Sequence, residues 1–563
     1  MPLDRRAAAD ALEEIAELLE LRGENPFRVR AFSGGARTVR GLADFEERLA
    51  AGTLTEVKGI GKGIAAEIEA LARTGASPLL AEARAAVPPS LREIRRVPGL
   101  GPKKARTLHD DLGIRSLAEL EYACRENRLR TLQGFGERTQ AKVLEALASM
   151  HRNEGMLRRD DCRTLESLAD GTARRFGGRA FAAGAYRRGE TLSRGLDLVV
   201  AAPDPRAALE AVLAALPVEE EIARDPRGTA RVRLASGAEA RVTAAPPGAL
   251  GAVLLAATGP AEHVRALWSL RARGAEGGEP VPWPTEEAFY ADLGLPFVPP
   301  ERRFDGSEIE AARVGRLPPL LERAAIRGCV HAHTTWSDGA GSVAEMLDAA
   351  AGAGLSWFGL SDHSPTASYA GGLTAERLAQ QQAEIDREAA RRPGLAVFKG
   401  TESDILGDGR LDYPGAVLDL FDFVVASVHS QFTMPRDAMT ARVLRAIGDP
   451  HTTVLGHPTG RLLLGRKGFD LDVPEVLRAC AREGVAVELN AHPARLDLDP
   501  EWMPLVKELR VTVSIGPDAH EPAGLGDLDH GVAVARRAGL PPDLVLNTRD
   551  AAGARAFFAG RRR

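Results

Sequence analysis

The sequence has few cysteines, and this excludes two classes of protein. Only 4 of the 563 residues are Cys, and no two of them have C-x-x-C spacing: Cys124, Cys162, Cys329 and Cys480. A disulfide-stapled secreted domain and a thiolate zinc site are therefore excluded. We expect the four cysteines to be packing residues of a protein in a reducing compartment.

The chain also lacks an excess of positive charge and any long apolar run. It has 73 Lys+Arg against 78 Asp+Glu, a net charge of -5 and a pI near 6.2, so any nucleic-acid binding must come from local sites. No apolar run approaches the about 18 residues of a membrane span. The first 19 residues are charged and amphipathic, unlike a secretory signal. We expect a cytoplasmic protein without membrane contact.

The length and the histidine distribution indicate several dissimilar domains. A chain of 563 residues is too long for one hydrophobic core. Nine of its 12 histidines lie after residue 330. The first 150 residues instead have the pattern of short helices joined by glycine-rich turns, for example a helix over 8–21 that ends at Glu24-Asn25-Pro26.

A glycine-rich turn recurs three times in this first part, at 57–63, 97–104 and 132–138. Such a turn before a helix directs several backbone N–H groups toward one point, which suits a phosphate. Residues 51–150 hold 16 basic against 12 acidic residues. Ordinary helical hairpins are the alternative, above all for the third turn. We expect DNA-backbone contacts from Gly59, Gly61, Lys62, Gly63, Gly99, Gly101, Lys103 and Lys104.

From residue 327 onward short apolar strands alternate with helical segments, which predicts a parallel barrel. The predicted strands are 330–334, 357–361, 395–400, 423–427, 454–456, 485–490 and 511–515. Barrel enzymes carry their chemistry at the carboxyl ends of the strands. Six histidines and three carboxylates stand at these ends: His331, His333, Asp338, His363, Glu402, His429, His457, Asp518 and His520.

This set of side chains predicts a cluster of metal ions. Residues i and i+2 of a strand face the same side, so His331 and His333 are expected to share one cavity, as are Asp518 and His520. Nine ligands exceed the three or four that one catalytic ion takes, so two or three ions are expected. Ligands without Cys favour Mn²⁺ or Zn²⁺, with Fe²⁺ an alternative. Such clusters suit phosphoester hydrolysis by a metal-bound hydroxide.

The segments HAHTTWSDG, SDH, GTESDILGDGRLDYP, ASVHS, GHPTGR and PDAH resemble the PHP (polymerase and histidinol phosphatase) phosphoesterase domain over about residues 325–563. The resemblance implies a distorted seven-stranded (βα)7 barrel, and it places the nine residues above as the ligands of a three-metal site. Arg461, Asn490 and Arg495 follow metal-site strands and are the candidates for holding a substrate phosphate. His492 is expected to support the ligands, whereas His451 and His530 are expected to be solvated.

The whole chain is similar to a bacterial family X DNA polymerase, on the segment ENPFRVRAF, the glycine-rich turns, GAYRRG and YADLGLP. The resemblance implies a multidomain α+β and α/β chain with a helix-hairpin-helix N-terminal region, a nucleotidyltransferase-like palm and the PHP barrel. Its domains would be a DNA-binding domain at 1–85, a fingers-like domain at 86–152, a palm at 153–250, a thumb-like region and linker at 251–322, and the PHP domain at 323–563.

The polymerase chemistry of that family does not carry over to this sequence. Two Mg²⁺ ions need an Asp-x-Asp pair and a third Asp on the next strand. The pair falls on Gly195 and Asp197, and Arg241 stands at the third position. Ala185 also replaces a phosphate-binding Ser, and Glu67 stands where related eukaryotic enzymes carry a lyase lysine. We therefore expect no Mg²⁺ at the palm and a polymerase core retained as a scaffold.

These observations predict a metal-dependent phosphoesterase that binds DNA, a 3′–5′ exonuclease or 3′-end-processing enzyme of DNA repair. It would hold the DNA backbone at gaps or 3′ ends, and we expect a monomer. Two alternatives remain open. One is an active gap-filling polymerase with a 3′–5′ exonuclease, and the other is a PHP phosphatase that acts on a small phosphomonoester.

Overall fold

The computed structural model describes residues 3–42, 44–125, 128–132, 134–153, 155–274 and 283–561, which form two compact units, Met1–Glu154 and Gly155–Arg563. No helix in these ranges is long and apolar enough to cross a membrane. Gln133, in the third glycine-rich turn, lies outside the described residues. The finer division of the chain into five domains stays a prediction.

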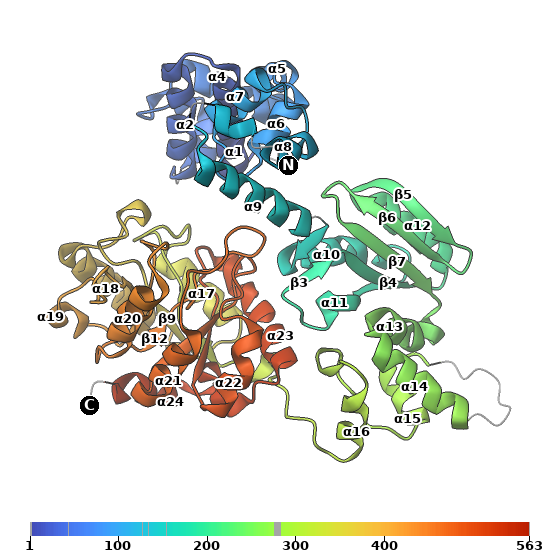
Figure 1. Ribbon diagram of the computed structural model, residues 1–563. Coiled ribbons are helices and arrows are strands. Elements are labelled where there is room, and N and C mark those ends of the chain that lie inside the picture. The colour runs from blue at the N-terminus through green and yellow to red at the C-terminus, as the bar shows by residue number, and fades with distance from the viewer. Residues whose placement is uncertain are drawn as a thin grey trace. The chain divides into compact units, whose positions relative to one another are not determined.

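The first unit is helical (Figure 1). Its core is built from aliphatic side chains at helical spacing, such as Leu12, Ile15 and Leu19, and the predicted first helix is confirmed. The helices are α1(Arg5–Arg22), α2(Pro26–Arg40), α3(Phe45–Ala51), α4(Lys62–Thr74), α5(Pro78–Ala86), α6(Pro89–Arg95), α7(Pro102–Asp111), α8(Leu117–Arg125) and α9(Glu137–Asn153).

The three glycine-rich turns of this unit share two backbone features in their described residues. In each, an N–H donates to the carbonyl three residues earlier, at 3.0, 3.0 and 3.1 Å for Ile60, Leu100 and Phe135. The glycine before each donor has a positive φ, of 103°, 85° and 87°, which favours glycine. The donors' own side chains are buried. The third turn is therefore built like the first two, although its sequence signal is weaker.

The second unit begins with a five-stranded mixed sheet of order β2-β4-β7-β6-β5, in which only β4 and β7 are parallel. Helices α10 and α12 share a core with one face of this sheet, and α13 with part of the other. The elements are β1(Met156–Arg158), α10(Arg159–Arg174), β2(Arg179–Ala182), α11(Gly184–Arg187), β3(Leu192–Arg194), β4(Leu196–Ala201), α12(Pro205–Ala215), β5(Val218–Asp225), β6(Thr229–Leu234), β7(Glu239–Ala245) and α13(Leu250–Thr258). Helices α14(Ala261–Gly274), α15(Glu286–Asp292) and α16(Ser307–Arg313) follow.

The remainder of the second unit is a seven-stranded parallel sheet of order β14-β13-β12-β11-β10-β9-β8. Its edges approach each other where Ala332 pairs with Ala519 in a parallel bridge, so the sheet curls into a nearly closed barrel, as predicted. The strands are β8(Gly328–Cys329), β9(Trp357–Leu360), β10(Ala396–Asp404), β11(Phe423–Ser427), β12(Val454–Leu455), β13(Ala486–Asn490) and β14(Val513–Gly516). The helices are α17(Val343–Gly352), α18(Ala375–Ala390), α19(Gly415–Leu418), α20(Arg436–Ile447), α21(Val473–Glu483), α22(Met503–Glu508), α23(Leu528–Ala538) and α24(Ala551–Gly560).

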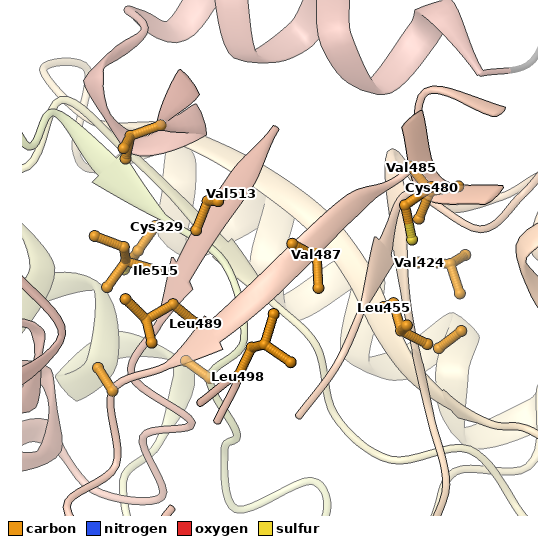
Figure 2. Close-up of a cluster of buried hydrophobic side chains, with 14 of the residues drawn as sticks. Cys329, Val424, Leu455, Cys480, Val485, Val487, Leu489, Leu498, Val513 and Ile515 are labelled. Carbon is orange, nitrogen blue, oxygen red and sulfur yellow. The ribbon is translucent and has the colours of Figure 1, made fainter. Parts of the chain in front are cut away.

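Side-chain alternation along the barrel strands separates two apolar clusters. One lies between the strands and the surrounding helices, and Figure 2 shows Val487 and Leu489 of β13 beside Val513 and Ile515 of β14 in it. The other consists of the alternate residues, and α24 closes it with Phe558: Val330, Trp357, Phe398, Phe423, Val425, Val454 and Ala486. This second set fills the barrel interior. On the same interior face, toward the carboxyl ends of β10 and β13, the apolar residues are followed by Glu402 and Glu488.

A candidate metal centre

The nine side chains predicted as metal ligands lie together at the carboxyl ends of the barrel strands. Glu402 is at the centre of the cluster and is buried. Five imidazoles have a ring nitrogen within 3.6 Å of one of its oxygens: His331, His333, His363, His429 and His457.

Two further carboxylates complete the cluster. The Oδ1 atom of Asp338 lies 3.5 Å from Nε2 of His363 and 3.4 Å from Nε2 of His520. The Oδ1 atom of Asp518 lies 3.4 Å from Nε2 of His331 and 3.4 Å from Nε2 of His333. Within the described residues, the ligand atoms fall into overlapping groups in which all atoms lie within 4.8 Å of one another, and these groups contain the nine predicted residues and no others.

The donor set fits divalent cations. Nε2 of His331 and both ring nitrogens of His333 are buried and have no hydrogen-bond partner. A buried polar atom left in this way costs about 1–3 kcal/mol, and coordination to a metal removes that cost. Imidazole and carboxylate ligands without thiolate suit Mn²⁺, Zn²⁺ or Fe²⁺. The cluster can thus hold metal, while the number and identity of the ions remain predictions.

Backbone strain is concentrated at these ligands. Among the residues that the structure describes, seven non-glycine residues have a positive φ, and three of them belong to the cluster: His331 at 73°, His457 at 23° and Asp518 at 51°. Residues in this region cost energy and persist where function requires them. The prediction that His331 and His333 lie on one extended strand is wrong, because β8 ends at Cys329 and the chain turns at His331. The two rings nevertheless converge, with centroids 5.5 Å apart.

The electrostatics of the cluster separate its histidines into two classes. Burial opposes protonation of His429 and His520, but the neighbouring carboxylates outweigh it and raise their pKa values to about 10 and about 9. His333 and His457 are neutral at pH 7, because burial and neighbouring cations lower their pKa values to about 4 and about 3. The pKa of Glu402 is held well below its usual range by the surrounding imidazoles, despite its burial. The carboxylates are therefore ionised and available as ligands.

Two carboxylates that sequence reasoning missed orient the ligands. Glu488, which is fully buried, accepts a hydrogen bond of 2.6 Å from Nδ1 of His331 and one of 2.6 Å from the backbone N–H of His457. Asp404 is bonded to Nδ1 of His429 at 2.6 Å. Both lie on the interior face of their strands, and this strand alternation is the signal that could have identified them.

The three predicted substrate residues occupy different surroundings. Arg461 donates to the carbonyls of Arg495 and Leu496 and pairs with Asp499, which favours a structural role. Asn490 donates to Glu488 and Asp518 at 3.1 Å each, which favours positioning of a ligand. Arg495 faces the cluster, with its Nε 3.2 Å from Oδ2 of Asp518. Substrate contact by any of the three stays a prediction.

The other barrel histidines are distributed differently from the prediction. His530 is buried on helix α23, so the expectation of a solvated loop position is wrong. His451 is half-buried and paired with Asp449 and Asp419, outside the cluster. The four cysteines are buried, as expected of packing residues.

In the palm-like sheet the structure places the two charged residues of the degenerate site face to face. Asp197 of β4 and Arg241 of β7 are direct neighbours in the parallel register, and Nε of Arg241 lies 3.3 Å from Oδ1 of Asp197. Gly195 has φ 76°, and a Cβ there would lie 2.3 Å from the carbonyl oxygen of Glu239. A carboxylate therefore cannot replace Gly195 without a backbone shift.

The predicted DNA-backbone residues lie at the starts of two helices in the first unit. Gly61 and Gly101 are the N-caps of α4 and α7, and Lys62, Gly63 and Lys103 are exposed in or next to the first turns. The unpaired N–H groups of a first helical turn attract anions. Phosphate binding at the eight predicted positions, Gly59, Gly61, Lys62, Gly63, Gly99, Gly101, Lys103 and Lys104, stays a prediction.

Glu67 lines a cavity of about 700 Å³ beside the first glycine-rich turn. Its Oε2 accepts hydrogen bonds from Ser77 Oγ at 2.5 Å and from the N–H of Leu79 at 3.3 Å. Ser77 is the N-cap of α5. The carboxylate at the expected lyase position thus stabilises the start of a helix, which a lysine could not do.

Comparison with known proteins identifies the parts of the chain. Residues 4–77 match a helix-hairpin-helix domain, residues 91–149 a SAM-like helix-hairpin-helix tandem, and residues 330–492 the PHP domain. Two probable phosphatases match the C-terminal part. That of Thermoanaerobacter sp. is 30% identical over 165 residues, 28% of this chain and 65% of the relative. That of Acetivibrio thermocellus is 29% identical over 227 residues, 39% of this chain and 89% of the relative.

One similarity covers nearly the whole chain. The DNA polymerase/3′-5′ exonuclease PolX of Bacillus subtilis (strain 168) is 34% identical over 571 residues, which span 97% of this chain and 98% of that relative. The matched family models follow the described fold, with helix-hairpin-helix matches in the helical first unit and the PHP match in the barrel. The chain therefore belongs to the PolX family of family X DNA polymerases, with N-terminal helix-hairpin-helix domains and a C-terminal PHP domain.

Proposed function

We propose that this chain is a metal-dependent 3′–5′ exonuclease or 3′-end-processing enzyme on DNA, with a polymerase core that no longer catalyses synthesis. The observation that carries the proposal is the nine-residue cluster at the carboxyl ends of the barrel strands, in a chain that also has helix-hairpin-helix domains. The Bacillus subtilis relative is named as both a polymerase and a 3′-5′ exonuclease, which supports the second activity.

The barrel residues prepare the site for phosphodiester hydrolysis. When bound, two or three Mn²⁺ or Zn²⁺ ions would supply Lewis acidity and a water of lowered pKa. The residues that would hold these ions are the nine predicted ligands, His331, His333, Asp338, His363, Glu402, His429, His457, Asp518 and His520. Arg495 contacts one of them, Asp518. In this proposal the Arg495 guanidinium orients the scissile phosphate. Glu488 and Asp404 keep the ring nitrogens of His331 and His429 directed toward the cluster.

The palm-like sheet does not support nucleotidyl transfer. Two Mg²⁺ ions need three carboxylates, and of the three predicted positions, Gly195, Asp197 and Arg241, only Asp197 carries one. Its charge is compensated by Arg241. Burial raises the pKa of Asp197, against the effect of Arg241 and then Arg188. A cation would have to displace Arg241 to reach the single carboxylate. The sheet is better explained as a scaffold.

The test is digestion of a 5′-labelled oligonucleotide, single-stranded or in a gapped duplex, with Mn²⁺. We expect a ladder of shortened labelled products, which reports removal of nucleotides from the 3′ end. The double variant His331→Ala/His333→Ala should give no ladder. His451→Ala is the matched control, because His451 lies in the barrel but outside the cluster, and it should digest DNA like the wild type.

Other outcomes would select the alternative functions. Release of phosphate from a phosphomonoester, with no attack on DNA, would identify a phosphatase, and the probable phosphatases among the relatives make this the second candidate. Extension of a primer by dNTPs that disappears in Asp197→Ala would show an active polymerase. A ladder of equal intensity in the double histidine variant would overturn the proposed site.

A further inference from the structure

A short hairpin lies next to the metal cluster and has no role in the function proposed above. Leu462 and Arg466 pair in an antiparallel bridge five to nine residues after His457. The N–H of Leu463 donates to the carbonyl of Ala494 at 2.7 Å, so the hairpin is attached to the loop that carries Arg495. Both loops follow strands, β12 and β13, whose carboxyl ends form the cluster. The hairpin is thus part of the rim of the site.

Arg466 is an exposed residue, but its guanidinium is partly buried by contacts that hold it in one orientation. Its Nε and Nη2 donate to the carbonyl of Gly460 at 3.3 and 2.9 Å, and its guanidinium lies 4.2 Å from the centroid of the Phe432 ring. Phe432 in turn stacks on Phe469, with centroids 6.2 Å apart and planes at 19°. In the described part of the chain these contacts of Arg466 are to a carbonyl and a ring, with no carboxylate among them.

A second guanidinium lies in the neighbouring loop. Arg495 contacts Asp518 of the cluster. The pKa of Arg466 is lowered, first by the partial burial of its guanidinium and second by the positive charge of Arg495. The guanidinium groups of Arg466 and Arg495 repel each other, and a bound anion that contacts both reduces this repulsion. Because Arg466 is ordered by its own contacts, it would lose little side-chain entropy on binding such an anion.

We infer that Arg466, stacked on Phe432, binds a backbone phosphate of a DNA strand whose scissile phosphate lies beside Arg495 at the metal cluster. The inference rests on the proposed function and specifies its substrate class. A small phosphoester has one phosphate and fills only the cluster and Arg495. A polynucleotide has a further phosphate on the same strand, and Arg466 contributes to binding only for that substrate.

The experiment compares two substrates in four proteins. The substrates are a 5′-labelled single-stranded oligonucleotide and the p-nitrophenyl ester of thymidine 5′-monophosphate, which has one phosphodiester. The proteins are the wild type, Arg466→Ala, Arg466→Lys and Arg510→Ala. Arg510 is the control for the loss of an exposed arginine from the barrel. It is ion-paired with Asp543, and it precedes β14, at the opposite end of that strand from the cluster.

We expect Arg466→Ala to lower kcat/KM on the oligonucleotide about tenfold, because the variant loses one charge-assisted hydrogen bond to the substrate. The chromogenic ester should be hydrolysed at the wild-type rate. A plot of log kcat/KM against log salt for the oligonucleotide should lose a slope of about 0.7, the value for one phosphate contact on a single strand. Arg466→Lys should keep that slope because it keeps the charge, and Arg510→Ala should behave as wild type on both substrates.

The outcomes separate this inference from the proposed function. A wild type that hydrolyses the ester but not DNA would refute the proposed function and this inference with it. A wild type active on DNA, with Arg466→Ala unchanged in rate and salt slope, would overturn this inference alone. An equal loss on both substrates would also overturn it, because that pattern indicates damage to the cluster, and a lowered Tm of the variant would identify such damage.

Discussion

The ring of His331 and the carboxylate of Glu488 are joined by a hydrogen bond of 2.6 Å, which fixes the nitrogen that His331 presents to the cluster. Because Oε1 of Glu488 accepts from Nδ1, Nε2 is left facing Glu402 and Asp518. Oε2 of Glu488 accepts from the N–H of His457. Gly516 allows this approach, since a Cβ there would lie 2.0 Å from Oε1 of Glu488. One carboxylate therefore orients two of the predicted ligands, His331 and His457.

We expect Glu488→Gln to weaken metal binding by about ten- to a hundredfold, the usual effect of removing a partner that orients a ligand. The amide has one oxygen where the carboxylate has two, so its NH₂ group would face either the ring N–H of His331 or the backbone N–H of His457. Mn²⁺ titration by calorimetry measures the change. Glu475→Gln, an exposed carboxylate on α21, is the control, and equal affinity in the two variants would show that Glu488 does not orient the ligands.

The grouping of the nine cluster residues could be predicted from sequence because they occur in short motifs at the ends of apolar strands. Their local backbone could not. Strand alternation was applied to His331 and His333, whereas the strand ends two residues before His331 and left-handed backbone at His331 and Asp518 directs the side chains. Side-chain direction at such a turn depends on tertiary contacts, which residue spacing does not contain.

The residues that support the site divide in the same way. Glu488 and Asp404 lie in regular strands, so a period of two would have placed them inside the barrel, although neither was among the predicted site residues. Arg461 was selected because it follows a ligand strand. Its hydrogen bonds to the loop of residues 495–499 became visible only when the fold brought that loop beside it. Long-range pairing of this kind is the part of the site that one sequence does not show.

A single substitution should not restore polymerase activity to the palm-like sheet. We expect no dNTP incorporation by the wild type and none by Arg241→Asp, because a third carboxylate is still missing at Gly195, where a side chain would meet the carbonyl of Glu239. Primer extension with Mg²⁺ and with Mn²⁺ measures this, with an active family X polymerase as positive control. Incorporation by Arg241→Asp would mean that two carboxylates suffice and that the sheet is a dormant polymerase site.

We expect Glu67→Lys to destabilise the first unit. We also expect the wild type to have no lyase activity at this position. The substitution removes the acceptor for Ser77 Oγ and the N–H of Leu79, and the loss of such a helix-start interaction costs about 1 kcal/mol. Urea unfolding of the first unit measures it against Glu69→Lys, an exposed position on the same helix that should change little. Borohydride trapping of the wild type on a 5′-deoxyribose phosphate should yield no adduct, and a trapped adduct would show that another amine acts there.

Glu286, the first residue of α15, forms two salt bridges. Its Oε2 lies 2.6 Å from Arg187 and its Oε1 lies 2.7 Å from Arg303, and Glu286 and Arg303 are both buried. Removing one partner of a buried pair leaves an uncompensated charge and costs about 3–5 kcal/mol. We therefore expect Glu286→Gln to lower the free energy of unfolding of the second unit by that amount at pH 7, with exposed Glu287→Gln nearly unchanged.

The pH dependence of the unfolding free energy is an independent test of the Glu286 salt bridges. Burial would raise the pKa of Glu286, but Arg303 and then Arg187 outweigh it, so the pKa in the folded state is lower than in the unfolded chain. A carboxyl of this kind stabilises the fold fully above its unfolded pKa, about 4.3, and loses that contribution as the pH falls through the folded value. The difference in unfolding free energy between wild type and Glu286→Gln should therefore be constant from pH 7 to about 5 and shrink below that. Denaturant titrations of both proteins across this range measure it, and a difference that grew on acidification would mean that Glu286 is not held ionised by the two arginines.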